Sequence, residues 1–212
     1  MTLGKSDVTK ALLHLKKDPI FKKLIQNYDL PAFSQRTKTD DLFAALVRAI
    51  VNQQLSGKAA DTILQRFKNL YKPKSFPTPL QVIKTSDEKL RACGLSYSKI
   101  KYIKGLALAV HEKTLDLQSL VDLSDEEVIF ELTKLKGIGK WTAEMILIFS
   151  LNRPDVFSLG DLGICTAVSR LYNVDRKNIK KIEKISLKWS PYRSIACWYL
   201  WRSLDNRPKV EE

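Results

Sequence analysis

The chain has 212 residues, of which 44% are hydrophobic, so it can bury a core and disorder is not expected. Lysine and arginine number 36 against 23 acidic residues, and the formal net charge is +13. This excess favours a polyanionic partner, because each phosphate contact releases counterions, although a basic protein with solvated charges is the simpler alternative. Residues 1–10 lack the apolar core of a signal peptide and no apolar run has membrane-spanning length, which argues against a membrane protein.

The first half of the chain predicts helices. Apolar residues recur at helical spacing over 42–51, and a break at Ser56-Gly57 separates this helix from a second one over 58–71. Three prolines in residues 72–79 predict a loop. Thr85 or Ser86 is expected to cap a short helix that ends at Gly94, and Ser96 or Ser98 to start a helix that runs to about residue 110.

The second half continues the pattern. Ser124 and Glu127 have the spacing of a capping box, which predicts a helix over 126–135. A further helix is expected from about Trp141 to Leu151, and another over residues 162–172. Because strand alternation is absent, the sequence predicts an all-α fold.

A short hairpin, LKGIGKWTA at residues 135–143, joins two of these helices. Glycine permits a positive φ and lets a phosphate approach the backbone, and the N–H groups at the start of the next helix attract an anion. Ile138 is expected to anchor the turn in the core. A glycine-terminated helix without any ligand is the alternative. The residues expected to contact a DNA phosphate, without reading sequence, are Lys136, Gly137, Ile138, Gly139, Lys140 and Thr142.

The segment LKGIGKWTAEM, followed by DVFSLGDLGI, resembles the helix-hairpin-helix, Gly/Pro, Asp (HhH-GPD) superfamily of DNA glycosylases. Within it, the chain is most similar to the alkylbase or 3-methyladenine DNA glycosylase II family. The likeness covers roughly residues 40–202 and includes the segments 49–60, 91–107 and 189–201.

This resemblance implies one glycosylase domain of two helical lobes. The central lobe is expected at about 42–150, and the second lobe at about 1–41 plus 151–212. The chain leaves no room for the β-rich N-terminal domain that some bacterial relatives carry.

Asp161 lies 22 residues after Gly139, close to the spacing of the family's catalytic aspartate. Loss of a base leaves positive charge on the sugar, which a carboxylate can stabilise while it orients or deprotonates water. Asp161 also precedes a predicted helix, so a plain helix N-cap is the alternative, and both roles can hold together. Gly160 stands where many relatives carry a second acidic residue, which changes the local field.

Aromatic residues suit a cationic damaged base. Trp141 and Tyr192 resemble walls of the family's base pocket, whereas Trp189, Trp198 and Trp201 are expected in the core. Trp141 stands at a position that resembles the one at which relatives that also cleave the DNA strand carry a lysine. That lysine forms a Schiff base. Tryptophan has no amine, so the resemblance implies a monofunctional enzyme that uses water. Arg193 is expected to pair with an acid or hold a phosphate, and His14 and His111 to lie on the surface.

The turn that contains Gln54, Leu55 and Ser56 resembles the family's minor-groove wedge, which fills the gap left by a flipped nucleotide. For Leu55, a place in the core is an equal alternative. Some relatives carry a bulkier, histidine-like group at the position of Ser56, so a serine predicts a weaker groove contact.

The primary hypothesis is a monofunctional DNA-3-methyladenine (alkylpurine) glycosylase of base excision repair, with no cofactor and no metal. The alternative is a glycosylase-like protein that binds damaged or abasic DNA and turns over poorly, and Ser56 and Gly160 motivate it. A hairpin module that tethers a larger complex is a third hypothesis, disfavoured because little chain lies outside the likeness.

The expected partner is double-stranded DNA with alkylated bases or abasic sites, bound by a monomer away from membranes. Cys93, Cys165 and Cys197 lie far apart without a C-x-x-C pair, which argues against zinc or a four-cysteine cluster and favours a reducing compartment. That compartment would be the nucleus in a eukaryote and the cytoplasm otherwise.

Overall fold

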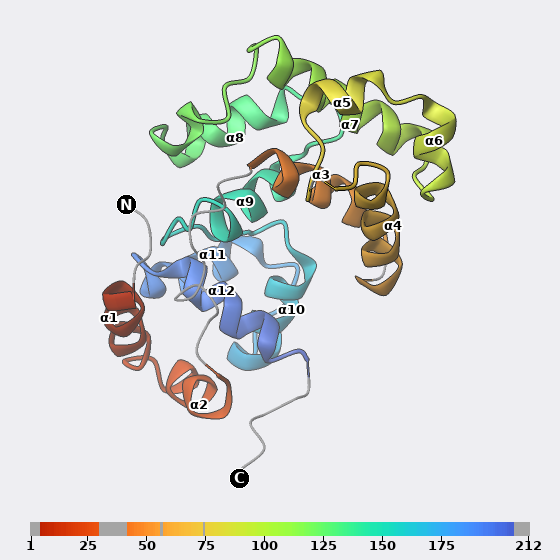
Figure 1. Ribbon diagram of the computed structural model, residues 1–212. Coiled ribbons are helices and arrows are strands. Elements are labelled where there is room, and N and C mark those ends of the chain that lie inside the picture. Colours follow the sequence, from red (N-terminus) through yellow and green to blue (C-terminus); the bar gives the residue numbers. More distant parts are fainter. Residues whose placement is uncertain (1–4, 30–41, 56, 74, 206–212) are drawn as a thin grey trace. The chain divides into compact units, whose positions relative to one another are not determined.

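The computed structural model describes residues 5–29, 42–55, 57–73 and 75–205. Within these ranges every regular element is a helix and no strand occurs, which confirms the all-α prediction (Figure 1). None of the helices described is long and apolar enough to cross a membrane. The elements are α1 (Lys5–Leu15), α2 (Pro19–Asn27), α3 (Leu42–Asn52), α4 (Gly57–Asn69), α5 (Pro79–Lys84), α6 (Asp87–Ala92), α7 (Tyr97–His111), η2 (Ser119–Val121), α8 (Asp125–Thr133), α9 (Lys140–Phe149), α10 (Leu162–Tyr172), α11 (Ile179–Ser186), η3 (Leu187–Trp189) and α12 (Arg193–Arg202).

The chain separates into two compact units. The central unit comprises residues 39–146, and the terminal unit comprises residues 1–38 together with 147–212. The boundary after residue 146 falls within α9, so the hairpin and the start of α9 belong to the central unit.

Helix α7 is the axis of the central unit and packs against α3, α5 and α6. Its N-cap is Ser96, whose side chain accepts a hydrogen bond from the Lys99 amide, and Ser86 caps α6 in the same way. The sequence left Thr85 or Ser86, and Ser96 or Ser98, as alternative helix starts, and the structure shows that Ser86 and Ser96 are the caps. The capping box predicted at Ser124 is present, with both of its bonds to Glu127.

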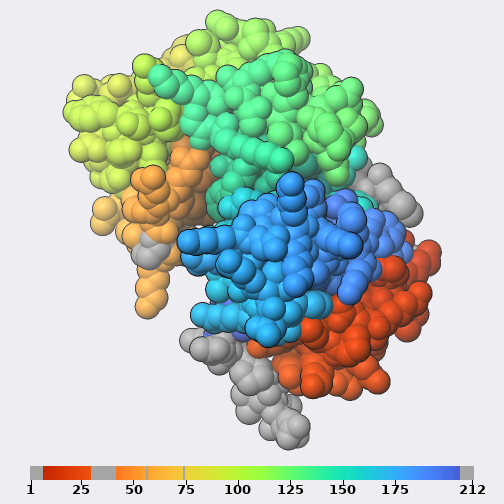
Figure 2. Space-filling model, turned by 180° about the vertical axis from the view of Figure 1, so that it is seen from behind, coloured from red at the N-terminus to blue at the C-terminus, as the bar shows by residue number. Residues whose placement is uncertain are grey.

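Helix α12 is the axis of the terminal unit and packs against α1, α2 and α10. Figure 2 shows the N-terminal helices of this unit, in red and orange-red, directly beside its C-terminal segments in blue. Trp189 is fully buried, as predicted, with the rings of Phe21, Phe157 and Tyr172 at centroid distances of 5.0, 5.7 and 5.9 Å. These aromatic contacts join the two ends of the chain in one core.

The three cysteines are free thiols, and all are buried. Cys93, Cys165 and Cys197 expose 3%, 5% and 0% of their surface. Burial raises the pKa of Cys93 and of Cys165, and the nearby charge of Asp161 raises that of Cys165 further.

Candidate DNA interface and active site

The hairpin between α8 and α9 is built around two glycines with different roles. Gly137 has a φ of +94°, and a Cβ added there would overlap the Tyr102 ring. Gly139 has no positive φ, and a Cβ there would meet nothing within 4 Å. Its carbonyl accepts the first helical hydrogen bond of α9, from the Ala143 amide at 3.0 Å, so Gly139 is the N-cap. The turn therefore requires glycine at 137, while at 139 glycine leaves the helix start open to a ligand.

Around the hairpin, one apolar side chain is buried and two lysine side chains are exposed. Ile138 is 4% exposed, which confirms its expected place in the core. Lys136 and Lys140 are exposed, and Lys140 lies 3.9 Å from the buried carboxylate of Glu144. Thr142, which was expected to contact a DNA phosphate, is 4% exposed, so little of it is accessible to a ligand.

The predicted wedge follows the end of α3. Gln54 is exposed with a φ of +56°, and Leu55 is 39% exposed, so the core alternative for Leu55 is wrong. Ser56 lies outside the described residues. Residues 53–55 are called the wedge turn below.

Gln53 connects the wedge turn to the hairpin. Its Nε2 donates a hydrogen bond of 2.8 Å to the carbonyl of Gly137, 84 residues away in sequence. A mainly polar groove of about 600 Å³ runs along this junction. Its lining residues are Gln53, Gln54, Ser96, Ser98, Lys99, Tyr102, Gly137, Ile138 and Gly139.

Asp161 is both the N-cap of α10 and a buried carboxylate. It is 8% exposed, and its Oδ1 accepts one hydrogen bond from the Ile164 amide at 2.8 Å and another from Trp201 Nε1 at 3.0 Å. The capping alternative therefore holds, and it leaves a catalytic role open. Gly163 allows this arrangement, because a Cβ there would lie only 3.1 Å from Oδ1 and 3.3 Å from the Trp201 ring.

Trp198 and Trp201 were predicted to lie in the core, but neither is fully buried, so the prediction is wrong for both. Of the two, Trp201 lies beside Asp161. The side chain is partly exposed, its ring lies 5.6 Å from that of Phe149, and its N–H holds Asp161. Local spacing on α12 could not reveal this contact, since the two partners are 40 residues apart.

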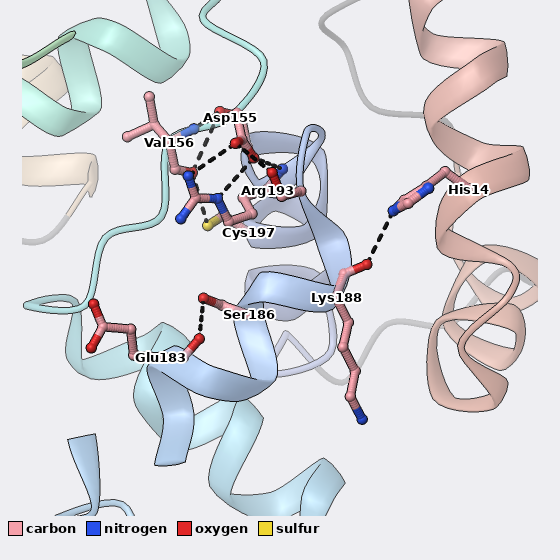
Figure 3. Close-up of polar contacts among 10 residues, drawn as sticks. His14, Asp155, Val156, Glu183, Ser186, Lys188, Arg193 and Cys197 are labelled. Atoms are coloured by element: carbon pink, nitrogen blue, oxygen red, sulfur yellow. Dashed lines mark hydrogen bonds and ion pairs between the residues drawn. The ribbon is translucent and has the colours of Figure 1, made fainter. Parts of the chain in front are cut away.

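Tyr192 is expected in the base pocket, and this stays a prediction. It precedes Trp201 by nine residues, which is about 13 Å along α12. The centroid of its ring lies 5.7 Å from that of the His14 ring. His14, which was expected on the surface, is partly exposed, and its Nε2 donates to the Lys188 carbonyl at 3.0 Å (Figure 3); His111 is exposed as expected. Helix geometry thus places Tyr192 at the far end of α12 from the residue that holds Asp161.

The segment before Asp161 is tied to the start of α12. Arg193 pairs with an acid, as one of its two predicted roles required: its Nε and Nη2 donate to Asp155 at 2.8 and 2.9 Å (Figure 3). Ser190 donates a third bond at 2.8 Å. Burial acts to raise the pKa of Asp155, but these hydrogen bonds outweigh it and the pKa lies below its usual value. The segment 154–156, which lies a few residues before Asp161, is thereby held against the start of α12.

No three His, Cys, Asp or Glu side chains among the described residues are grouped to hold a metal ion.

The described residues thus combine an all-helical fold, a helix-hairpin-helix motif with two glycines before α9, and a buried aspartate at the start of α10. Residues 47–191 match the family model described as "HhH-GPD superfamily base excision DNA repair protein", and the chain belongs to this superfamily.

Individual relatives agree with this assignment. The chain is 37% identical to DNA-3-methyladenine glycosylase 1 of Schizosaccharomyces pombe over 201 residues, which is 93% of this chain and 88% of that one. It is 33% identical to the DNA-3-methyladenine glycosylase of Saccharomyces cerevisiae over 93% of this chain and 81% of the other. The solved structure of the S. pombe enzyme (Mag1) in complex with abasic DNA superposes with a TM-score of 0.80 at 36% identity, covering 95% of this chain and all of that chain.

Proposed function

We propose that this protein is a monofunctional DNA-3-methyladenine (alkylpurine) glycosylase of base excision repair. It binds duplex DNA, flips the damaged base and hydrolyses the N-glycosidic bond. The observation that carries the proposal is Asp161, a buried carboxylate that two N–H donors hold in one orientation. The relatives named DNA-3-methyladenine glycosylase support the substrate class.

The reaction needs little beyond this carboxylate. An alkylated purine with a positive charge is a good leaving group, and breaking its bond to C1′ of the sugar leaves oxocarbenium character on the sugar. The negative charge of Asp161 stabilises that sugar. The base departs with the electron pair of the broken bond, a water oxygen bonds to C1′, and Asp161 accepts the proton from that water.

The same residues argue against strand cleavage through a Schiff base. Trp141 has no amine, and it is 46% exposed, so its π face can receive an electron-poor base. The neighbouring Lys140 lies beside the carboxylate of Glu144. Hydrolysis by water is therefore the reaction that we assign.

DNA binding is assigned to the hairpin and the wedge turn. The open N-terminus of α9 at Gly139 can receive one phosphate, with Lys136 and Lys140 beside it. The exposed side chains of Gln54 and Leu55 fill the gap that an extruded nucleotide leaves.

A single-turnover assay tests the proposal. Duplexes that carry 3-methyladenine or 7-methylguanine should release the free base, and undamaged duplex should not. Borohydride should trap no covalent protein–DNA adduct on abasic DNA, and a trapped adduct would contradict the monofunctional assignment. An absence of base release together with tight binding to abasic duplex would favour the damage-binding alternative that Gly160 and Ser56 motivate.

A further inference from the structure

Lys99, in the first turn of α7, donates hydrogen bonds to two backbone carbonyls at the end of another helix. Its Nζ donates to the carbonyl of Val51 at 2.7 Å and to that of Gln53 at 2.8 Å. Both carbonyls lie at the C-terminal end of α3, where helix carbonyls lack intrahelical partners and the helix dipole favours a cation. Partial burial of the ammonium lowers the pKa of Lys99.

The second of those carbonyls belongs to the residue that reaches the hairpin. Gln53 accepts from Lys99 through its backbone and donates to the Gly137 carbonyl through its side chain. One chain of hydrogen bonds therefore runs from α7 through the wedge turn to the hairpin. Tyr102, one turn after Lys99 on α7, covers the other side of Gly137 so closely that no Cβ could fit there.

These contacts make α7 a common support for both elements that we assign to DNA. Lys99 fixes the wedge turn, Tyr102 fixes the hairpin, and Gln53 connects the two. Two of the lysine's three N–H donors are committed to backbone carbonyls, so its role is different from that of the exposed Lys136 or Lys140.

We propose that Lys99 is a positioning residue that locks the wedge turn to the hairpin, so that a phosphate held by the hairpin sets the depth at which Gln54 and Leu55 enter the duplex. The inference rests on the proposed function of the wedge turn and hairpin. Lys99 touches no reacting atom in this scheme: it acts through Gln53.

The test compares Lys99→Met with Lys101→Met. Both variants remove one positive charge from α7, but Lys101 is exposed and makes no hydrogen bond or ion pair with the residues that the structure describes. Binding to undamaged duplex should weaken in both variants, because each loses one positive charge of the field that attracts a polyanion. Binding to abasic duplex and release of 3-methyladenine should fall about tenfold further in Lys99→Met, which corresponds to about 1.4 kcal/mol.

A double-mutant cycle with Leu55→Ala separates positioning from general destabilisation. If Lys99 acts through the wedge turn, Lys99→Met should add less than about twofold to the loss already caused by Leu55→Ala. Lys99→Arg, which keeps the charge and the donors, should recover part of the loss. Thermal unfolding of each variant shows whether that variant is folded at the assay temperature.

Equal abasic binding by Lys99→Met and Lys101→Met would overturn the proposal, and so would full additivity with Leu55→Ala. The abasic-to-intact binding ratio reports on the wedge turn even if wild-type protein releases no base. Failure of the proposed enzymatic function can therefore be distinguished from failure of this inference.

Discussion

Replacing Gly137 by alanine tests the construction of the hairpin most directly. Gly137 has a φ of +94°, and its missing side chain leaves the space that the Tyr102 ring occupies. A left-handed conformation costs an L-residue about 1–2 kcal/mol, and forcing one extra carbon into a packed site costs about 1–3 kcal/mol. The expected loss in the free energy of unfolding is therefore about 2–5 kcal/mol.

Gly139→Ala is the matched control on the other side of Ile138. A Cβ at Gly139 meets nothing within 4 Å and the φ is not positive. Alanine is a poorer N-cap than glycine by about 1 kcal/mol, but it restricts the unfolded chain by about 0.4–1 kcal/mol, so the two effects nearly cancel. The new methyl group should instead obstruct a phosphate and weaken duplex binding severalfold.

Denaturant unfolding and duplex binding at one salt concentration, measured on both variants, check this reasoning. Gly137→Ala in a Tyr102→Ala background should retain only the backbone strain, about 1–2 kcal/mol relative to Tyr102→Ala alone. If Gly137→Ala destabilises the protein no more than Gly139→Ala does, the account of the two glycines is wrong.

Three further variants test the site. Asp161→Asn keeps an oxygen that can accept from Ile164 and Trp201 but loses the charge, so stability should change by less than about 1 kcal/mol while base release falls about 100-fold or more; unchanged release would remove Asp161 from its role. Lys140→Glu should weaken binding to all duplex sequences alike, and titration over a range of salt should show a smaller slope; binding insensitive to salt in wild type would contradict the electrostatic assignment. The lowered pKa of Asp155 contributes stability above about pH 4, which is lost as the pH falls through the folded-state pKa. Asp155→Asn should therefore cost about 1–3 kcal/mol at pH 7 and less in acid, and an equal loss at both pH values in denaturant unfolding would exclude the ionised pair as the cause.

Much of the fold follows from local signals. The apolar spacing over 42–51 and 162–172 predicts α3 and α10 to within a residue, and Ser86, Ser96 and Ser124 mark helix starts because capping involves only neighbouring residues. The short helix α5 was not predicted, since its six residues hold too few apolar positions to show a period.

The contacts that organise the site come from residues distant in sequence. Lys99 meets Val51 across 48 positions and Trp201 meets Asp161 across 40, so no local pattern contains either pair. Two glycines beside an apolar residue predict a tight turn, but which of them takes the positive φ depends on Tyr102, which packs against Gly137 from another helix. Asp161 could be placed from its distance to the hairpin, whereas its hydrogen-bond partners required the structure.

The burial of the three thiols affects how this protein withstands the alkylating agents that create its proposed substrates. Alkylating agents that modify purines also attack thiolates, which are stronger nucleophiles than ring nitrogens. Cys93, Cys165 and Cys197 expose at most 5% of their surface, and burial raises the pKa of the first two, which disfavours the reactive thiolate. The fold therefore shields the three thiols of this protein from the agents that methylate DNA.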